Sequence, residues 1–352
     1  MKISSDKLTS LPPQSSKPCI FIVPEKLRQG DKESYMPRNV SIGPYHRHNS
    51  GVMQMEGHKL WYLKIFLEHN QKCGLKDYIE RIRSWEDRAR SCYNRQINLS
   101  PNKFAKMMLL DGIFVIQLFL MFWKPQWRLD GNQIFSMPLM VNDIRRDLLL
   151  LENQMPFFAV EGLFEMAFGS HQKHMPRLLE LTYKFFATAT KIEELPEAVM
   201  ESELNHFLDA IRLLYLPSER EAPYHLLEEI KFIPSSTELA AAGIKLRRVE
   251  SKSKGFNVKF QNGVLEIPCL NLNKLESYFR NIIAFEQCYY PVDSYLNDYI
   301  DAKLLIKKRI IEHWLGNEDA ATDLINSFCK DTFPWTRNHY FNSLRHELIE
   351  HC

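Results

Sequence analysis

DLLLLENQMPFF, the stretch from Asp147 to Phe158, places three polar residues between two strongly apolar runs. A similar stretch, RNIIAFEQC from Arg280 to Cys288, occurs later in the chain. A polar group in a protein core needs a hydrogen-bond partner, because an unpaired one costs roughly 1–3 kcal/mol. We therefore expect both stretches to contribute to a structural polar network. Its predicted members are Glu152, Asn153, Gln154, Asn281, Glu286 and Gln287.

Apolar residues recur at helical spacing along most of the chain. One series runs from Leu75 to Tyr93, and another runs from Leu204 to Tyr215 and is stopped by Pro217. Ser100 followed by Pro101 is typical of a helix start. These patterns predict a mainly α fold: a large multi-helix globular domain with a small β-hairpin element.

The β-hairpin is predicted from FNVKFQNGVLEIP, residues 256–268. Asn262 and Gly263 are the residue types that a two-residue hairpin turn needs, because both tolerate the left-handed backbone region. Just before this stretch, Ser235 and Glu238 form a capping box for a short helix that Gly243 can end.

The 352 residues are evenly composed, with 45% hydrophobic residues and no Gly/Ser or Pro-rich linker. We predict a disordered segment at residues 1–17 and one domain, with room for two lobes, at residues 18–352. No apolar segment long enough for a signal peptide precedes Cys19. The seven cysteines are scattered and never spaced Cys-x-x-Cys, which favours free thiols in a reducing compartment and a cytoplasmic location.

The charge is nearly balanced, with 45 basic and 43 acidic residues and a net charge of +2. This balance is unlike the concentrated basicity of a nucleic-acid binder, so we expect no nucleic-acid partner. One basic contact patch stands out as a candidate surface for an acidic lipid or a protein partner, with Glu250 as its only acidic neighbour in the sequence. Its alternative is a solvated loop, which we favour. The patch comprises Lys245, Arg247, Arg248, Lys252, Lys254 and Lys259.

Met107 to Trp123 is the longest apolar run, and Asp111 and Gln117 interrupt it. Its 17 residues are at the lower limit for crossing a membrane, and a carboxylate inside a span is unfavourable. We predict a central core helix.

Several side chains could carry chemistry, but each has a plainer interpretation. His46 is a candidate general base, and the alternative is a histidine that fixes the Gly43-Pro44 turn by hydrogen bonds. Cys288 is a candidate nucleophile or a buried thiol. Glu152 and Glu286 could form an acid–base pair, or each could pair with an amide, a backbone turn or a basic residue such as Arg146 or Arg280.

A metal site is not expected from the sequence. His171 and His174 are three residues apart, but Gly169 and Pro176 suggest a loop, and no further ligand is near. The usual phosphate-binding, dinucleotide-binding, zinc-protease and serine-hydrolase motifs are absent. We predict no catalytic residue, no cofactor and no metal.

The chain resembles the plant domain of unknown function 247 family in a series of motifs that occur in the family's order. They are IFIVPEKL, YMPRNVSIGPYH, MEGHKLWYLKIFL, MMLLDGIFVIQLF, RRDLLLLENQMPFF, STELAAAGIKL, FQNGVLEIP and RNIIAFEQC. The resemblance implies a mainly helical protein without an assigned activity. It also implies relatives with a C-terminal hydrophobic anchor at a membrane, some linked to self-incompatibility or defence.

This chain departs from the family pattern in three places. It is shorter between Tyr295 and Leu304, compact between Tyr224 and Ser235, and lacks the anchor. The helical series that starts at Thr336 reaches Cys352 without a stop signal, which is expected of either a shortened chain or a fraying end.

Together these observations predict a non-enzymatic recognition or signalling protein with an unknown protein partner. The alternative is an uncharacterised hydrolase or transferase with a carboxylate, histidine or cysteine site. A shared pocket lined by His46, Glu152, Glu286 or Cys288 would favour the enzyme, whereas separate structural partners would favour the interaction protein.

Overall fold

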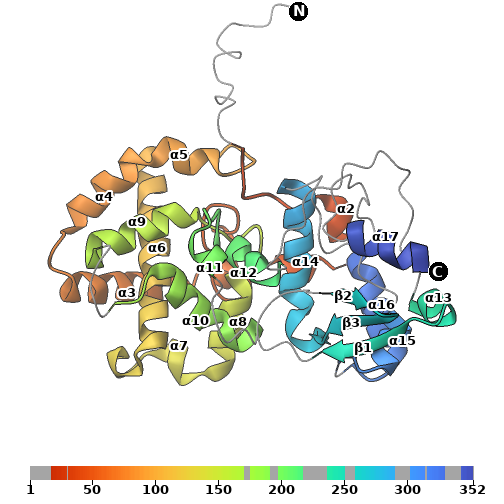
Figure 1. Ribbon diagram of the computed structural model, residues 1–352. Coiled ribbons are helices and arrows are strands. Elements are labelled where there is room, and N and C mark those ends of the chain that lie inside the picture. Colours follow the sequence, from red (N-terminus) through yellow and green to blue (C-terminus); the bar gives the residue numbers. More distant parts are fainter. Residues whose placement is uncertain are drawn as a thin grey trace, which may run out of the picture.

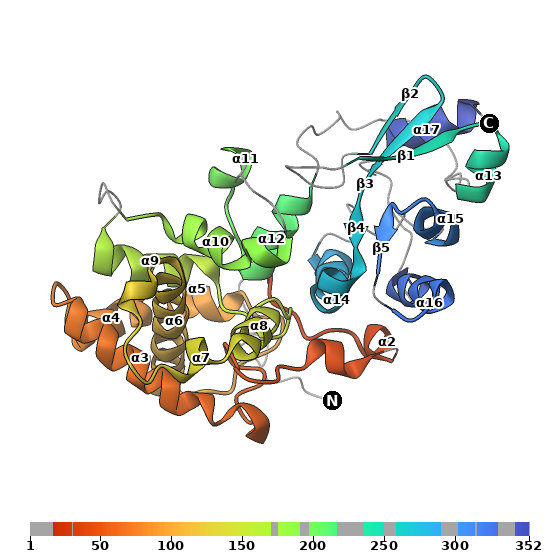
Figure 2. The same cartoon turned by 90° about the horizontal axis from the view of Figure 1, so that it is seen from below.

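The computed structural model describes residues 17–29, 31–169, 175–190, 197–216, 236–249, 258–289, 302–313, 315–329 and 342–351. Figures 1 and 2 show two groups of elements. We call the described part of residues 17–216 the helical region and that of residues 236–351 the C-terminal region. Helices dominate both, so the prediction of a mainly α fold is confirmed.

The helical region is built from α-helices and short 3-10 turns without a named β-strand among its described residues. Its elements are α2 (Glu25–Arg28), η1 (Lys32–Tyr35), η2 (Ser50–Val52), α3 (Met55–His69), α4 (Leu75–Ser84), α5 (Glu86–Ser91), α6 (Pro101–Trp123), η3 (Pro125–Trp127), α7 (Gln133–Ser136), α8 (Pro138–Asp147), α9 (Phe157–Phe168), α10 (Leu178–Thr190), α11 (Glu197–Met200) and α12 (Phe207–Tyr215).

Helix α6 is the centre of the helical region. It begins at Pro101 as predicted, although the Ser100 side chain makes no capping hydrogen bond. Helices α3, α4, α9 and α10 pack against it, and Figure 2 shows it nearly end-on with these helices around it. Within the described part of the chain, it is the one helix long and apolar enough to cross a membrane, yet 94% of its most apolar 18-residue window is buried inside the protein. Burial on all sides explains why its sequence is apolar on all sides.

Two predicted helices begin or break at different residues from those expected. The series from Leu75 to Tyr93 is interrupted at Trp85, whose backbone (φ −102°, ψ −1°) separates α4 from α5. Leu204 lies outside α12, which begins three residues later. The reason is His206, whose Nδ1 accepts a hydrogen bond from the Asp209 amide at 3.1 Å and so caps the first turn.

The C-terminal region contains a three-stranded sheet next to α13 (Ser236–Ala241). Its strands are β1 (Lys245–Val249), β2 (Lys259–Gln261) and β3 (Val264–Pro268), in the order β1-β3-β2. The predicted hairpin is formed by β2 and β3, and its turn residues Asn262 (φ 52°) and Gly263 (φ 70°) take the left-handed conformation. Strand β1 pairs parallel with β3, with Lys245 opposite Val264, and this pairing was not predicted. Ser235 of the predicted capping box lies outside the described residues.

Helix α14 (Leu272–Tyr289) lies between the two regions (Figures 1 and 2). It packs against α10 and α12 on one side and against α16 on the other. The other C-terminal elements are β4 (Leu270–Asn271), α15 (Ala302–Lys307), β5 (Ile311–Glu312), α16 (Glu318–Cys329) and α17 (Asn342–His351). Strands β4 and β5 pair in parallel, and α17 packs against β2.

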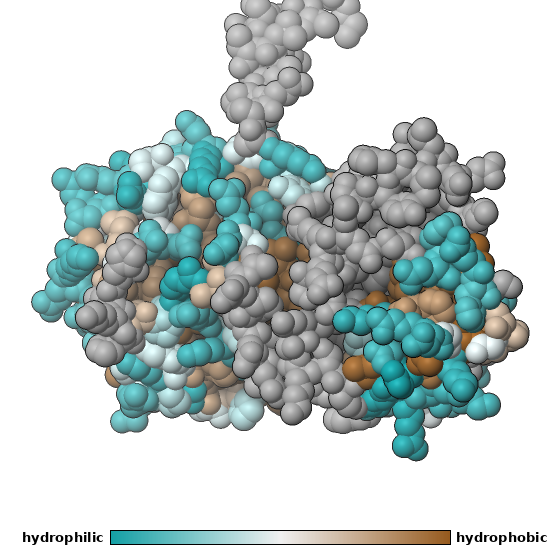
Figure 3. Space-filling model, in the orientation of Figure 1, coloured by the Kyte–Doolittle hydropathy of each residue, from teal (hydrophilic) through white to brown (hydrophobic). Residues whose placement is uncertain are grey.

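Of the predicted disordered segment, residues 1–16 lie outside the described residues, as does Thr336 of the predicted terminal helix. Lys17 is described, and its ammonium lies 4.3 Å from the centre of the Tyr289 ring and donates to the Tyr289 carbonyl. The face of the molecule shown in Figure 3 is mostly hydrophilic over the described helical region, with small separate hydrophobic groups.

Candidate functional site

Asn153 connects the turn after α8 to the segment of residues 38–47. Its Nδ2 donates to the carbonyls of Val40 and Asp147, both at 2.9 Å, and its Oδ1 accepts from the Ile42 amide at 2.7 Å. The Asn153 amide itself donates to the Leu150 carbonyl at 3.0 Å, which closes the turn. The side chain therefore replaces backbone partners that two irregular segments cannot offer each other.

The Gln154 side chain likewise links backbone groups, here the turn after α8 and the start of α12. Its Nε2 donates to the carbonyls of Leu148 (2.7 Å) and Leu150 (2.9 Å). Its Oε1 accepts from the Phe207 amide at 3.1 Å, one of the first-turn amides that have no partner within their own helix. The side chain is fully buried, so all of these bonds are made without water.

Glu152 holds the N-terminal segment. Its Oε1 accepts from the Val23 amide at 2.6 Å and from the Arg28 guanidinium, and its Oε2 lies 3.1 Å from His46 Nε2. Burial by itself raises the pKa of Glu152, but His46, Arg28 and the Val23 amide together outweigh it, so the pKa lies below its usual value. The carboxylate is therefore ionised at neutral pH, and its Oε1 accepts from two donors.

The later stretch places its polar residues on α14. Asn281 is fully buried, and its side chain donates to the Ser34 carbonyl and accepts from the Leu151 amide, both at 2.9 Å. Glu286 Oε1 accepts from Arg212 Nε at 2.9 Å, and both side chains are buried. Gln287, the remaining predicted member of the network, is half-buried.

The basic partners named for the two glutamates were wrong. Arg146 lies 3.0 Å from its neighbour Asp147, and Arg280 lies 3.8 Å from Asp31. The glutamates instead take cations from segments far away in sequence, which only the folded chain brings near. Glu152 and Glu286 also have separate partners, so these contacts do not assemble an acid–base pair.

Sequence reasoning missed two buried carboxylates. Asp147 accepts hydrogen bonds from the three successive amides of residues 38–40 at 2.7–3.0 Å. Burial raises its pKa, and those amide bonds only partly oppose the shift. Asp111, in the middle of α6, accepts from Lys59 Nζ at 2.6 Å and from the Gly43 amide at 2.9 Å. The sequence signal for Asp111 was its interruption of an apolar run, whereas Asp147 only precedes one. The partners of neither acid could be inferred from the sequence.

Gly43 fits tightly against the first polar stretch, residues 147–158. Its φ is +76°, and a Cβ atom at this position would lie 2.3 Å from the Gln154 carbonyl oxygen. The Tyr93 hydroxyl donates to that same oxygen at 3.3 Å. Position 43 therefore requires glycine, because the Cβ atom of any other residue would clash with the Gln154 backbone.

The remaining chemical candidates differ in what surrounds them. The imidazole of His46 is directed at Glu152, which lies far along the chain from the Gly43-Pro44 turn. Burial raises the pKa of the half-buried Cys288 thiol to about 11, which disfavours the thiolate. His171 and His174 lie outside the described residues, and the described part of the chain has no group of three metal-ligating side chains.

The basic contact patch is partly neutralised. Glu266 on β3 lies opposite both Arg247 and Lys259 across the sheet and forms an ion pair with Arg247. Arg248 forms a second ion pair, with Glu312 at 2.8 Å. The expectation that Glu250 is the only acidic neighbour is therefore wrong, because strand pairing brings acids from elsewhere in the chain. Lys245 and Lys259 are exposed, and Lys252 and Lys254 lie outside the described residues.

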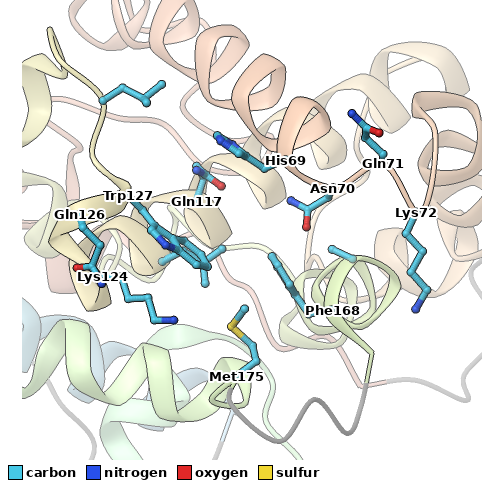
Figure 4. A pocket seen from close by; sticks show the side chains of 13 residues that line it. His69, Asn70, Gln71, Lys72, Gln117, Lys124, Gln126, Trp127, Phe168 and Met175 are labelled. Atoms are coloured by element: carbon cyan, nitrogen blue, oxygen red, sulfur yellow. The ribbon is translucent and has the colours of Figure 1, made fainter.

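A cavity of about 750 Å³ lies elsewhere in the helical region, between the C-terminal end of α3, α6, η3 and the end of α9 (Figure 4). Sequence analysis missed it, because it combines the ends of elements that are distant in sequence. None of His46, Glu152, Glu286 and Cys288 is among its lining residues. The one sequence signal that points to it is Gln117, which interrupts the apolar run of α6.

Comparisons with known proteins confirm the family resemblance of the motifs. A family model described as "Plant protein of unknown function", DUF247, matches residues 20–352. UPF0481 protein At3g47200 from Arabidopsis thaliana is 29% identical over 363 residues, which cover 93% of this chain and 75% of that protein. Putative UPF0481 protein At3g02645, also from Arabidopsis thaliana, is 26% identical over 208 residues, 57% of this chain and 38% of that protein. No solved structure matches the chain. Because the family model spans nearly the whole sequence, the chain belongs to the plant DUF247 family.

Proposed function

We propose that this plant protein is a non-enzymatic recognition or signalling protein that acts by binding another protein. Self-incompatibility and defence are the settings that the resemblance of its motifs implies. One observation carries the proposal: Glu152 and Glu286 pair with separate cations, and none of the candidate catalytic side chains lines the cavity.

General acid–base catalysis requires a group that can reach the substrate. Glu152 and Glu286 are each only 1% exposed, and their contacts are with Arg28, His46, the Val23 amide and Arg212. A buried carboxylate that is paired in this way fixes the position of the segments that carry its partners. The arrangement suits a rigid scaffold that presents a fixed surface to a partner.

The alternative is an uncharacterised enzyme, and one contact favours it. His46 Nε2 lies 3.1 Å from Glu152 Oε2, and a carboxylate that orients an imidazole is a recurring part of general-base sites. Against this, His46 is itself 8% exposed, and the raised pKa of Cys288 disfavours it as a nucleophile.

Affinity purification from plant tissue, followed by reconstitution with the purified candidate partner, tests the proposal. We expect a binary complex whose dissociation constant changes less than threefold in His46→Gln and Cys288→Ser variants, which remove the two catalytic candidates. In parallel, the protein is assayed with chromogenic ester, glycoside and phosphate substrates. Turnover that disappears in His46→Gln while the variant stays folded would reject the interaction role in favour of the enzyme.

We also propose that the domain resides in the cytosol, and that membrane association in the family comes from an anchor outside its helical core. Free thiols support the reducing compartment. They are Cys19, Cys73, Cys92 and Cys288. Imaging of an N-terminal fluorescent fusion in plant cells tests the proposal, and signal in the secretory lumen would contradict it.

A further inference from the structure

The cavity described above has the size of a small-molecule site. Its volume of about 750 Å³ lies inside the range of roughly 300–1,000 Å³ that ligand pockets occupy. Its walls come from α6, the ends of α3 and α9, η3 and adjoining loop residues such as Lys124 and Met175. Figure 4 shows Gln117 in the upper part of this space, with the Trp127 indole beside it and Phe168 and Met175 further along the wall.

Gln117 is the observation that points to a ligand. Its side chain is only 4% exposed, yet it lines the cavity, and no hydrogen bond to it occurs within the described part of the chain. The other buried amides of this protein behave differently: Asn153, Gln154 and Asn281 each make at least two bonds. An amide in a buried site costs free energy unless something in the cavity bonds to it.

The walls around Gln117 are apolar and aromatic. Trp127, Phe168 and Met175 line the cavity together with Leu120 of α6. Phe168 is buried, whereas Trp127 and Met175 are partly buried, so the latter two have surface left to cover. A flat apolar body with one hydrogen-bonding group complements these walls.

The lining residues of the cavity that the structure describes carry positive charge without a balancing carboxylate. Lys72 and Lys124 both line it, and no carboxylate does so among the described lining residues. Lys124 Nζ lies 4.3 Å from the centre of the Trp123 ring and 4.9 Å from that of Trp127, which holds the ammonium next to the aromatic wall. Neither lysine forms an ion pair in the described part of the chain. A negatively charged group on the ligand would meet these cations without displacing an acidic side chain.

We propose that this cavity binds a small apolar molecule that carries a single carboxylate. The apolar body lies against Trp127, Phe168 and Met175, while the carboxylate accepts a hydrogen bond from the Gln117 amide and faces the Lys124 ammonium. The site is separate from the buried polar network, and the proposal holds whether or not the protein binds a protein partner.

The probe is 2-naphthoate, with 2-naphthamide as its neutral counterpart of nearly the same shape. Binding of each to the full chain is measured by isothermal titration calorimetry at low ionic strength. We expect saturable one-to-one binding of 2-naphthoate that is about tenfold tighter than that of 2-naphthamide, because a bond to a charged acceptor is stronger than its neutral equivalent. No saturable binding at millimolar 2-naphthoate, or equal affinity for both probes, would overturn the proposal.

Three variants locate the binding. Lys124→Gln is expected to lower the 2-naphthoate affinity toward that of 2-naphthamide while leaving the 2-naphthamide affinity unchanged. Gln117→Leu, which keeps the site filled, is expected to weaken both probes about five- to tenfold through the lost hydrogen bond. Lys184→Gln is the matched control, because Lys184 also lies over the Trp123 ring, at 5.7 Å, but does not line the cavity. If Lys184→Gln weakens 2-naphthoate as much as Lys124→Gln does, the anion binds elsewhere and the assignment is wrong.

Discussion

The helical region and the C-terminal region use charge in opposite ways. In the helical region, Lys59 and Asp111 form an ion pair in which neither side chain is more than 1% exposed. In the C-terminal region, the ion pair of Arg247 with Glu266 lies at the surface, with side chains 62% and 32% exposed. Water and salt screen the second pair but not the first. The buried pair of the helical region therefore holds structure together, whereas the exposed pair on the sheet can be replaced at little cost in stability.

The largest expected effect comes from breaking a buried pair. Asp111→Leu removes the buried carboxylate that Lys59 Nζ contacts at 2.6 Å and that accepts from the Gly43 amide, and it leaves Glu56 as the acidic partner of Lys59. The free energy of unfolding should fall by about 3–5 kcal/mol, because a buried ion pair is broken. Urea denaturation followed by circular dichroism measures the change. Adding Lys59→Met to this variant removes the buried ammonium that has lost this partner and should recover part of the loss. A single variant within about 1 kcal/mol of the parent would show that the comparison between regions is mistaken.

The next effect concerns pH and His206. Burial lowers the pKa of His206 to about 4 from an ordinary 6.5, while Asp209 and the Cys19 carbonyl oppose the shift only weakly. Between pH 4 and pH 6.5, His206 is protonated in the unfolded chain but neutral in the folded protein. The folded state therefore loses stability as the pH falls from 6.5 to 4. At about 1.4 kcal/mol per pH unit, the loss amounts to about 3 kcal/mol.

His206→Gln tests this pH dependence, because glutamine keeps a donor for the Cys19 carbonyl, which His206 Nε2 contacts at 3.0 Å, but does not titrate. The unfolding free energies of parent and variant are compared at pH 7 and at pH 4.5. The variant should be less stable at pH 7, through the weakened helix cap, and should show a smaller loss on acidification. Identical slopes would mean that His206 does not contribute to the acid sensitivity of the helical region.

A third effect separates backbone strain from close packing. Gly43 and Gly131 both have left-handed backbones, with φ of 76° and 81°, but only Gly43 has a neighbour within reach of an added Cβ. Gly131→Ala should cost about 1–2 kcal/mol from the conformation alone. Gly43→Ala should cost about 1–3 kcal/mol more, because the methyl group meets the Gln154 carbonyl. Thermal unfolding of both variants gives the difference, and equal losses would show that the contact relaxes easily.

The smallest effect is expected on the sheet. Glu266→Gln removes the partner of Arg247 but leaves an exposed guanidinium in water, so the free energy of unfolding should change by less than about 1 kcal/mol. The small difference from the parent should shrink further in 0.5 M NaCl. A loss as large as that of Asp111→Leu would erase the distinction between the two regions.

Local sequence patterns were sufficient to predict where several elements begin or turn. Ser100-Pro101 located the start of α6, and Asn262-Gly263 located the turn between β2 and β3. These features depend on backbone preferences of neighbouring residues, which the sequence states directly. The break at Trp85 and the late start of α12 were not predicted, because tertiary contacts such as the His206 cap decide where a continuous helical pattern ends.

Pairings between distant segments could not be predicted. Glu152 contacts Arg28 and His46, and Glu286 pairs with Arg212, where arginines nearby in the sequence had been expected as partners. The cavity around Gln117 was missed for the same reason, since its lining residues meet only after α3, η3 and α9 have packed around α6.

The sequence by itself indicated that Glu152, Asn153, Gln154, Asn281 and Glu286 would be polar groups in an apolar setting, because long hydrophobic runs pack into the core together with the polar residues that interrupt them. It also determined the helical class through the spacing of apolar residues. Only the tertiary structure decided which donor meets which acceptor and where a cavity stays open. Those outcomes depend on distances between segments more than a hundred residues apart, such as Asn153 and Val40, and no local preference encodes such a distance.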